Sequence, residues 1–221
     1  MKVLLFGASG MVGGGVLIEC LRSPEVTEVL SVGRSPSGKH DPKLRELQVP
    51  DLTRLEPFEG QLRGYDAAFF CLGVASAGMT EAEYRRTTYD LTVAVANTLV
   101  RLNSGLTFVY VSGAGTDSSE HGRRMWARVK GETENALLRM PFKAAYMFRP
   151  ALIQPREGVR SKTRSYRLVY AILWPFLPLL LRLAPNSTTS TDRVGRAMIR
   201  VAGHGPQKHL LETRDINALS S

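Results

Sequence analysis

The chain has 221 residues, of which 43% are hydrophobic, and a formal charge of +9 at pH 7. This length can bury a full-sized core and is typical of one domain with a modest appendage. The two cysteines, Cys20 and Cys71, exclude a disulfide framework, and a glycine-rich turn interrupts the first apolar run before it could form a signal peptide. We therefore expect a cytoplasmic protein.

The positive charge lies in the last third of the chain. Residues 1–148 contain 17 Lys and Arg against 16 Asp and Glu, whereas residues 149–221 contain 12 against 4. A basic balance points to a nucleic acid, a membrane surface or an anionic ligand. No recognised nucleic-acid motif accompanies the charge, so we predict no nucleic-acid partner. The histidines and cysteines stand at none of the usual ligand spacings, so we predict no metal site.

Short apolar runs alternate with helical patterns along the first two thirds of the chain. Lys2–Phe6 is a predicted strand that ends in glycine, and Val12–Leu21 carries apolar residues at helical spacing. Thr80 is placed to cap a long helix over Glu81–Leu102. Further strands are predicted at Val26–Val32, Leu47–Val49, Ala67–Leu72, Leu106–Val111 and Ala144–Phe148, with a helix at Met125–Arg139. This alternation predicts an α/β fold with a doubly wound parallel sheet.

The pattern changes after Arg149-Pro150. Residues 151–190 are expected to form a small C-terminal elaboration on the substrate side of a single domain that spans residues 1–221. A helix at about Thr191–Ala202 and a short strand at His209–Glu212 are predicted to close the fold.

Residues 168–181 form an almost wholly apolar run that follows a basic stretch. The run has 14 residues and contains Pro175 and Pro178, so we do not expect it to span a membrane. One interpretation is a buried helix and turn over the substrate end of the sheet. The other is an apolar lid or a peripheral membrane contact through residues 156–182, with Trp174 at the interface, which would suit a hydrophobic substrate.

The turn after the first strand contains the glycines Gly7, Gly10 and Gly13. In such a turn one glycine allows the sharp bend, one lets the backbone approach a pyrophosphate, and one lets helix and strand pack closely. The pyrophosphate then lies at the helix N-terminus, whose free N–H groups favour negative charge. Because the turn follows a strand and opens a helix, we predict a dinucleotide site rather than a merely structural turn. The intervening Ser9, Met11 and Val12 are expected to share in it.

The end of the second strand indicates which dinucleotide is bound. An acidic residue there would bind the ribose 2′-hydroxyl of NAD, whereas an arginine accommodates the 2′-phosphate of NADP. The sequence has Arg34 and Ser35 at this place and no acid. We therefore predict NADP, with NAD the lesser candidate; a solvated surface arginine is the alternative interpretation of Arg34.

The motifs at the strand ends resemble those of the atypical and extended short-chain dehydrogenase/reductases, which are NAD(P)-binding, epimerase/dehydratase-like proteins. The similarity covers nearly the whole chain and is greatest to the oxidoreductase branch that resembles the Tat-interacting protein. The matching motifs are Gly7-x-x-Gly10-x-x-Gly13, Asp51-Leu52, Cys71-Leu72-Gly73, Val111-Ser112, Lys130-Gly131-Glu132 and Phe148-Arg149-Pro150. The resemblance implies a single NAD(P)-binding domain with a Rossmann fold.

The resemblance also implies where the cofactor lies. It places Asp51 and Leu52 near the adenine, Leu72 and Gly73 beside the adenosine ribose, Lys130 against the nicotinamide ribose, and Pro150, Ala151 and Leu152 around the nicotinamide.

The family's chemistry uses a serine, and a tyrosine four residues before a lysine. The tyrosine moves a proton, the lysine lowers its pKa and orients the ribose, and the serine polarises the carbonyl. Ser112 and Lys130 match this pattern and are the predicted catalytic residues, but Trp126 stands at the tyrosine position. An indole N–H can donate a hydrogen bond but cannot cycle a proton near neutral pH.

Three interpretations of Trp126 stay open. The acceptor could take its proton from water, as a quinone or flavin does; His121 or Tyr89 could supply it; or the protein could bind NADP as a sensor or scaffold without turnover. Tyr84 and Tyr89 stand in a predicted helix, which favours packing over catalysis. The first hypothesis is therefore an NADP-dependent oxidoreductase acting on a small or apolar carbonyl, quinone or flavin-like acceptor, and the second is a binding protein. The sequence indicates no oligomeric state.

Overall fold

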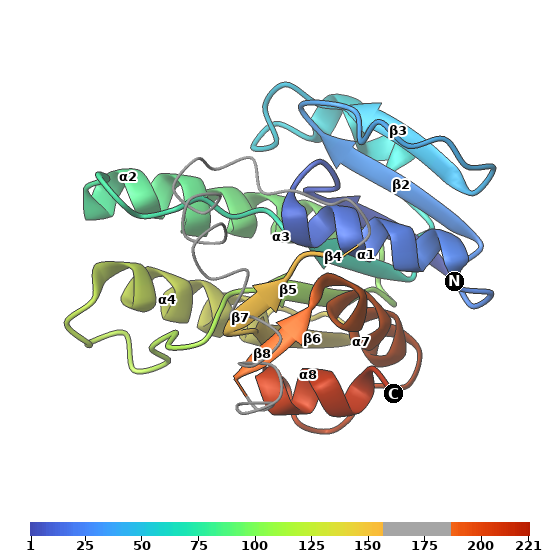
Figure 1. Ribbon diagram of the computed structural model, residues 1–221. Helices are drawn as coiled ribbons and strands as arrows, with labels where there is room; N and C mark the ends of the chain where they lie inside the picture. The colour runs from blue at the N-terminus through green and yellow to red at the C-terminus, as the bar shows by residue number, and fades with distance from the viewer. Residues whose placement is uncertain (157–186) are drawn as a thin grey trace.

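A computed structural model of the protein describes residues 1–156 and 187–221 (Figure 1). The strands are β1 (Lys2–Phe6), β2 (Glu28–Gly33), β3 (Leu44–Gln48), β4 (Ala67–Phe70), β5 (Thr107–Val111), β6 (Ala144–Arg149), β7 (Leu152–Gln154), β8 (Thr188–Ser190) and β9 (Leu210–Glu212). The helices are α1 (Met11–Arg22), the 3-10 helix η1 (Glu56–Gln61), α2 (Glu81–Arg85), the π-helical turn η2 (Arg86–Asp90), α3 (Leu91–Leu102), α4 (Met125–Arg139), α7 (Thr191–His204) and α8 (Thr213–Leu219).

Seven strands form one parallel sheet in the order β3-β2-β1-β4-β5-β6-β9. Helices α1 and α7 cover one face of the sheet, and α3 and α4 cover the other (Figure 1). Alternate residues of each strand enter the two cores: Leu4 and Phe6 pack on the α3 side, and Val3 and Leu5 on the α1 side. The predicted doubly wound parallel sheet is confirmed.

The long helix predicted at Glu81–Leu102 consists of α2, η2 and α3 in direct succession. Thr80 caps it as predicted, since its hydroxyl accepts the Glu83 amide while the Glu83 carboxylate accepts the Thr80 amide, which forms a capping box. The π-helical turn at Arg86–Asp90 was not predicted. Turns of this kind insert a residue into a helix and are frequent near functional sites.

The structure differs from the predicted elements mainly outside the central strands. The third strand is Leu44–Gln48 instead of Leu47–Val49, because this sheet-edge strand exposes most of its side chains and lacks a continuous apolar run. Neither the short parallel pair of β7 and β8 nor α8 was predicted. The apolar run 168–181 and almost all of the expected membrane contact through 156–182 lie outside the described residues. None of the described helices combines the length and apolar character that a membrane span requires.

Helices α1 and α7 cross at glycines. A Cβ added to Gly15 would lie 2.4 Å from the Thr191 Cβ, and one added to Gly195 would lie 2.8 Å from the Glu19 Cβ. The two backbones therefore approach more closely than any larger residue at these positions would allow. This crossing holds α7 against the helix that follows the glycine turn.

We expect Gly15→Ala to destabilise the protein by about 1 kcal/mol or more. Alanine favours a helix by up to about 1 kcal/mol over glycine, but the overpacked contact with Thr191 costs roughly 1–3 kcal/mol. Gly203→Ala in α7 is the matched control, because a Cβ there meets only the Glu25 Oε2 at 3.7 Å. Urea unfolding measures both variants. A Gly15→Ala protein as stable as Gly203→Ala would contradict the close crossing.

Candidate functional site

A cavity of about 700 Å³ opens at the carboxyl ends of the central strands. It lies where the strand order reverses between β1 and β4, which is the place at which doubly wound sheets bind ligands. Its walls come from the segments that follow β1, β2, β4, β5 and β6, and from the helices α2 and α4. The parallel sheet therefore gathers residues that are far apart in sequence.

The glycine turn forms one end of this cavity. Gly7 has a φ of +90°, and a Cβ there would lie 2.9 Å from the Cys71 carbonyl carbon. A Cβ on Gly13 would lie 2.2 Å from the Gly7 carbonyl oxygen. Among the described residues, no side chain caps the N-terminus of α1, where Gly10 is the N-cap. The first-turn amides, which have no intrahelical partners, thus form the arrangement that suits an anion.

Most of the predicted site residues line the cavity. They are Gly7, Ser9, Gly10, Met11, Val12, Arg34, Leu72, Gly73, Ser112, Lys130, Pro150 and Ala151. The other predicted residues lie elsewhere: Gly13 is buried in the turn, Leu52 is buried in the core, Ser35 and Asp51 are exposed, and Leu152 belongs to β7 while its neighbour Ile153 lines the cavity. Contact of either group with a cofactor stays a prediction.

Several lining residues were not predicted. They are Cys71, Val74, Ala75, Ser76, Tyr84, Val111, Gly113, Ala114 and Ile153. Most of them directly follow β4 or β5, so the rule that ligands lie at carboxyl strand ends could have found them. Tyr84 lacked such a signal, because it reaches the cavity from α2 through tertiary packing.

Lys130 lies in the cavity wall on α4. Its Nζ donates a hydrogen bond to the backbone carbonyl of Ser112 at the end of β5. Burial lowers the pKa of Lys130 to about 8, and the charge of Glu134, one helical turn further on, acts in the opposite direction. Lys130 is therefore a cation whose charge changes close to physiological pH.

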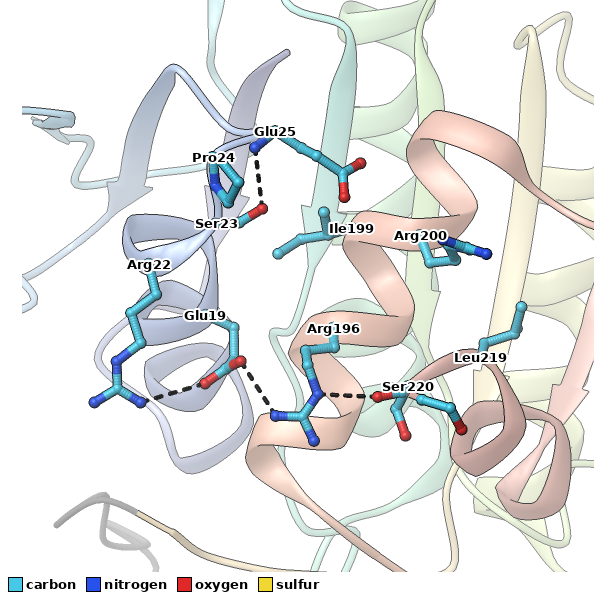
Figure 2. Close-up of a pocket in the computed structure, with 11 residues that line it drawn as sticks. Glu19, Arg22, Ser23, Pro24, Glu25, Arg196, Ile199, Arg200, Leu219 and Ser220 are labelled. Carbon is cyan, nitrogen blue, oxygen red and sulfur yellow. Dashed lines mark hydrogen bonds and ion pairs between the residues drawn. The ribbon is translucent and has the colours of Figure 1, made fainter.

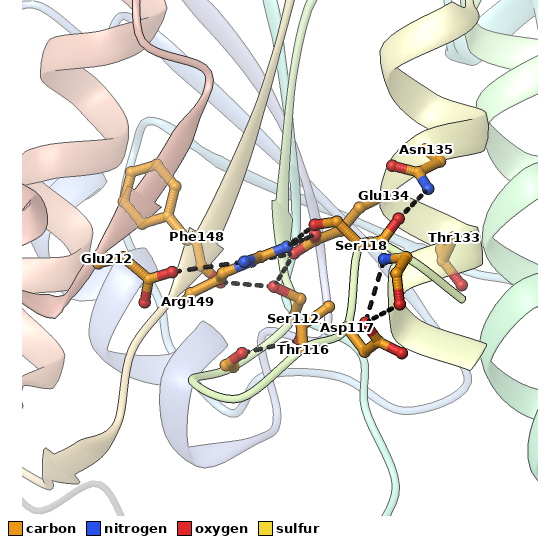
Figure 3. A network of polar contacts seen from close by, with 12 residues as sticks. Ser112, Thr116, Asp117, Ser118, Thr133, Glu134, Asn135, Phe148, Arg149 and Glu212 are labelled. Carbon is orange, nitrogen blue, oxygen red and sulfur yellow. Dashed lines mark hydrogen bonds and ion pairs between the residues drawn. The ribbon is translucent and has the colours of Figure 1, made fainter. Parts of the chain in front are cut away.

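The Ser112 hydroxyl takes part in a buried polar network (Figure 3). Its Oγ contacts the Glu134 Oε1 and lies 3.1 Å from the Phe148 carbonyl oxygen. Arg149 binds the same carboxylate with two nitrogens, with the Nε 3.0 Å from Oε1 and the Nη2 in an ion pair with Oε2. Ser112 lines the cavity, but the Glu134 carboxylate is the nearest acceptor for its hydroxyl proton.

The structure also places the candidates for a proton donor. Trp126 and Tyr84 both line the cavity, and only 2% of Tyr84 is exposed. Tyr89 packs under Arg85, whose guanidinium carbon lies 4.2 Å from the ring centre, and His121 is exposed in a loop. Among the described residues, therefore, Tyr84 is the tyrosine that lines the cavity.

Ion pairs connect α2 to α4 and so fix Tyr84 relative to Lys130. Arg85 pairs with Glu132, and the Nη2 of Arg128 lies 2.6 Å from the Glu81 Oε2. The side chains of both pairs are partly exposed, and water weakens each pair to roughly 1 kcal/mol or less. Their contribution is mainly to orientation.

A second, smaller cavity of about 320 Å³ lies between α1, α7 and α8 (Figure 2). The carboxylate of Glu19 lies 3.6 Å from Arg22 and 3.4 Å from Arg196. The Nε of Arg196 also donates to the Ser220 carbonyl oxygen. Two of the arginines that line this cavity therefore share one carboxylate.

No family model matches the sequence. Curated relatives include the fmp52-2 protein of Aspergillus oryzae, 27% identical over 96% of this chain and 93% of that protein, and the fmp52 protein of Aspergillus clavatus, 30% identical over 76% and 74%. The rat protein HTATIP2 is 26% identical over 69% of this chain and 62% of its own length.

Solved structures with the same fold bind NAD. The enzyme WbmF of Bordetella bronchiseptica, in complex with NAD+, has a TM-score of 0.69 at 14% identity and covers 99% of this chain and 76% of its own. The UDP-glucuronic acid 4-epimerase of Bacillus cereus, in complex with NAD, has a TM-score of 0.68 at 13% identity, over 96% and 77%. At this identity the likeness establishes the fold alone.

The sheet order and the glycine turn define a Rossmann-type α/β fold, as the sequence predicted. The 30% identity to the Aspergillus clavatus protein, over 76% of this chain, identifies the family. The chain belongs to the fmp52 family, and its similarity to HTATIP2 confirms the predicted branch.

The expected cytoplasmic location is wrong. The fmp52 relatives from Aspergillus oryzae, Emericella nidulans and Scheffersomyces stipitis are all named mitochondrial proteins. The expectation depended on cysteine count and on the absence of a secretory signal, and neither of these distinguishes the cytoplasm from other reducing compartments.

The lowered pKa of Lys130 makes stability depend on pH. In the unfolded chain a lysine keeps its proton up to about pH 10.4, whereas the folded protein releases it at about pH 8. Between these values the unfolded state binds more protons, so the unfolding free energy rises with pH. We expect the wild type to gain a few kcal/mol relative to Lys130→Met between pH 7.5 and pH 10. Urea unfolding at both pH values measures this gain, and parallel pH profiles would exclude a buried, destabilised ammonium.

Proposed function

We propose that this protein is an NADP-dependent oxidoreductase of the short-chain dehydrogenase/reductase class that acts on a small or apolar carbonyl, quinone or flavin-like acceptor. The observation that carries the proposal is that one cavity joins the glycine turn at Gly7 and Gly10 to the ammonium of Lys130. The first feature suits a pyrophosphate, and the second suits the ribose and the reacting end of a dinucleotide.

The residues present fit such a cofactor. The glycine turn leaves no room for side chains at Gly7 and Gly13, which keeps the backbone open to a pyrophosphate. Met11 and Val12 would present their amides to it, and Lys130 would hold the nicotinamide ribose. A reduced nicotinamide dinucleotide supplies a hydride when bound. The chain's own task is to orient that group, exclude water and stabilise charge on the acceptor.

Arg34 supports NADP over NAD. It is exposed at the end of β2 and lines the cavity, and the acidic residue that would select NAD is missing from this position. A guanidinium can bind a 2′-phosphate through two N–H groups, which gives geometric selectivity as well as affinity.

The proton has two sources in this proposal. A quinone or flavin-like acceptor would take it from water, because Lys130 can stabilise the anion that forms first. A carbonyl acceptor would need a donor within reach, and the phenol of Tyr84 is the candidate because Trp126 cannot cycle a proton and Ser112 donates to Glu134.

The second candidate function is an NADP-binding sensor or scaffold without turnover. Trp126 at the tyrosine position and the engaged hydroxyl of Ser112 favour it, since both remove groups that the family's chemistry uses. This candidate needs the same cofactor site but no proton donor.

Arg34→Ala tests the cofactor preference. We expect the affinity for NADPH to fall about tenfold to a hundredfold, because a charge-assisted pair with the 2′-phosphate is lost, and the affinity for NADH to stay unchanged. Isothermal titration calorimetry measures both. Arg63→Ala is the control, since Arg63 is an exposed arginine whose partner is Glu59. Equal losses for both cofactors, or tighter binding of NADH by the wild type, would contradict the assignment.

Turnover separates the two candidate functions. We expect the wild type to oxidise NADPH with quinone or flavin acceptors, as followed at 340 nm, and Lys130→Met to be slower by about tenfold or more. Trp126→Tyr should add activity toward aldehydes, because it restores a phenol four residues before Lys130. Tyr84→Phe should lower only carbonyl reduction. Activity found in Trp126→Tyr alone would favour the sensor, and wild-type activity unaffected by Lys130→Met would refute the site.

A further inference from the structure

Glu134 is a fully buried acidic residue on α4, one helical turn after Lys130. Its carboxylate accepts hydrogen bonds from the Ser112 hydroxyl and from two nitrogens of Arg149 (Figure 3). Arg149 in turn lies at the end of β6 and reaches the Ser118 hydroxyl. A continuous polar chain thus runs from the cavity wall into the space between α4 and the sheet.

This series of hydrogen bonds accounts for the direction of the Ser112 hydroxyl. A hydroxyl has one proton to donate, and in Ser112 that proton has the buried Glu134 carboxylate as its acceptor. The backbone carbonyl of Ser112 meanwhile accepts from the Nζ of Lys130. Ser112 therefore connects the Glu134 carboxylate, through its hydroxyl, to the Lys130 ammonium, through its backbone carbonyl.

A buried ion pair is a poor device for stability, because the desolvation of both charges offsets much of their attraction. The pair adjoins Ser112, which lines the cavity, so its effect on neighbouring groups explains it better. Among the described residues, Tyr84 on α2 and Cys71 after β4 line the same cavity as Lys130, the charge of Glu134 acts on Tyr110 of β5, and Arg149 of β6 pairs with Glu134. Burial raises the pKa of Cys71 and of Tyr110, so both stay neutral near pH 7.

We propose that Glu134, held by Arg149, is a positioning residue that keeps Lys130 positively charged in the cofactor cavity and directs the Ser112 hydroxyl away from it. The proposal rests on the proposed function for the use of the cavity. It deepens that function by assigning stabilisation of charge at the reacting end to Lys130 instead of Ser112. Burial lowers the pKa of Lys130, and the negative charge of the Glu134 carboxylate raises it, which favours the protonated form.

The test measures the charge of Lys130 without any cofactor. Trace acetylation with acetic anhydride modifies only neutral amines, so the pH dependence of labelling at Lys130, measured by mass spectrometry, gives its midpoint. We expect a wild-type midpoint near pH 8. Glu134→Gln should lower that midpoint by about one pH unit. The double variant Glu134→Gln/Arg149→Gln, which removes both buried charges, should lower it by less.

Glu132→Gln is the matched control. Glu132 lies nearer to Lys130 in sequence but pairs with Arg85 toward α2, so its loss should leave the midpoint unchanged. Exposed lysines such as Lys39 report the ordinary reactivity within the same sample. If Glu134→Gln does not fold, as judged by circular dichroism, the labelling midpoint of Lys130 in the double variant is compared with that of the wild type instead. The same midpoint in the wild type and in the folded variant would overturn the proposal, and so would an equal shift in Glu132→Gln.

NADPH titration of the same proteins keeps the two proposals distinguishable. A wild type that binds no nicotinamide dinucleotide would refute the proposed function, whereas the labelling midpoints would still decide the role of Glu134. If both hold, Glu134→Gln should weaken NADPH binding severalfold at pH 8 and less at pH 6, where Lys130 is protonated in either protein. Equal weakening at both pH values would indicate a merely structural role and would overturn the proposal.

Discussion

The parallel register of β1, β4, β5 and β6 is the constraint on which the candidate site depends. Because neighbouring strands run in the same direction, the segments that follow all four strands begin at the same edge of the sheet. The glycine turn after β1 can approach the segment after β4 only because Gly7 has no Cβ to meet the Cys71 carbonyl. The close crossing of α1 and α7 at Gly15 and Gly195 then holds in place the helix that follows the turn. The site is thus defined by backbone packing before any side chain contributes.

Two opposing electrostatic effects meet at the other end of the cavity. Burial disfavours the charged form of Lys130, and the carboxylate of Glu134 favours it. Glu134 is fully buried and Lys130 is partly buried in the cavity wall, so the balance depends on the partners that the fold supplies, above all Arg149 and the carbonyl of Ser112. The network in Figure 3 therefore belongs to the chemistry of the cavity as much as to the stability of the core.

The sequence predicts what depends on repeated patterns. Continuous apolar runs indicate strands whose two faces are covered, and the glycine spacing indicates the turn at Gly7. It misses what depends on three-dimensional neighbours: β7 and β8 have three residues each, and Thr188–Ser190 is buried by packing and pairing instead of by hydrophobicity. The direction of the Ser112 hydroxyl depends on a carboxylate on another element, so the motif that contains Ser112 could not reveal it.

The absence of a tyrosine at position 126 and the orientation of Ser112 have the same chemical consequence. Each withdraws from the cavity a hydroxyl that could protonate or polarise a carbonyl, while Lys130 keeps a cation there. A cation lowers the energy of an anionic product without transferring a proton to it. Under the proposed function, such a site would favour acceptors whose reduced form is a stabilised anion over simple carbonyls, whose alkoxide needs a proton at once and would depend on Tyr84 for it. The missing hydroxyls would then bear on the choice of acceptor as well as on rate.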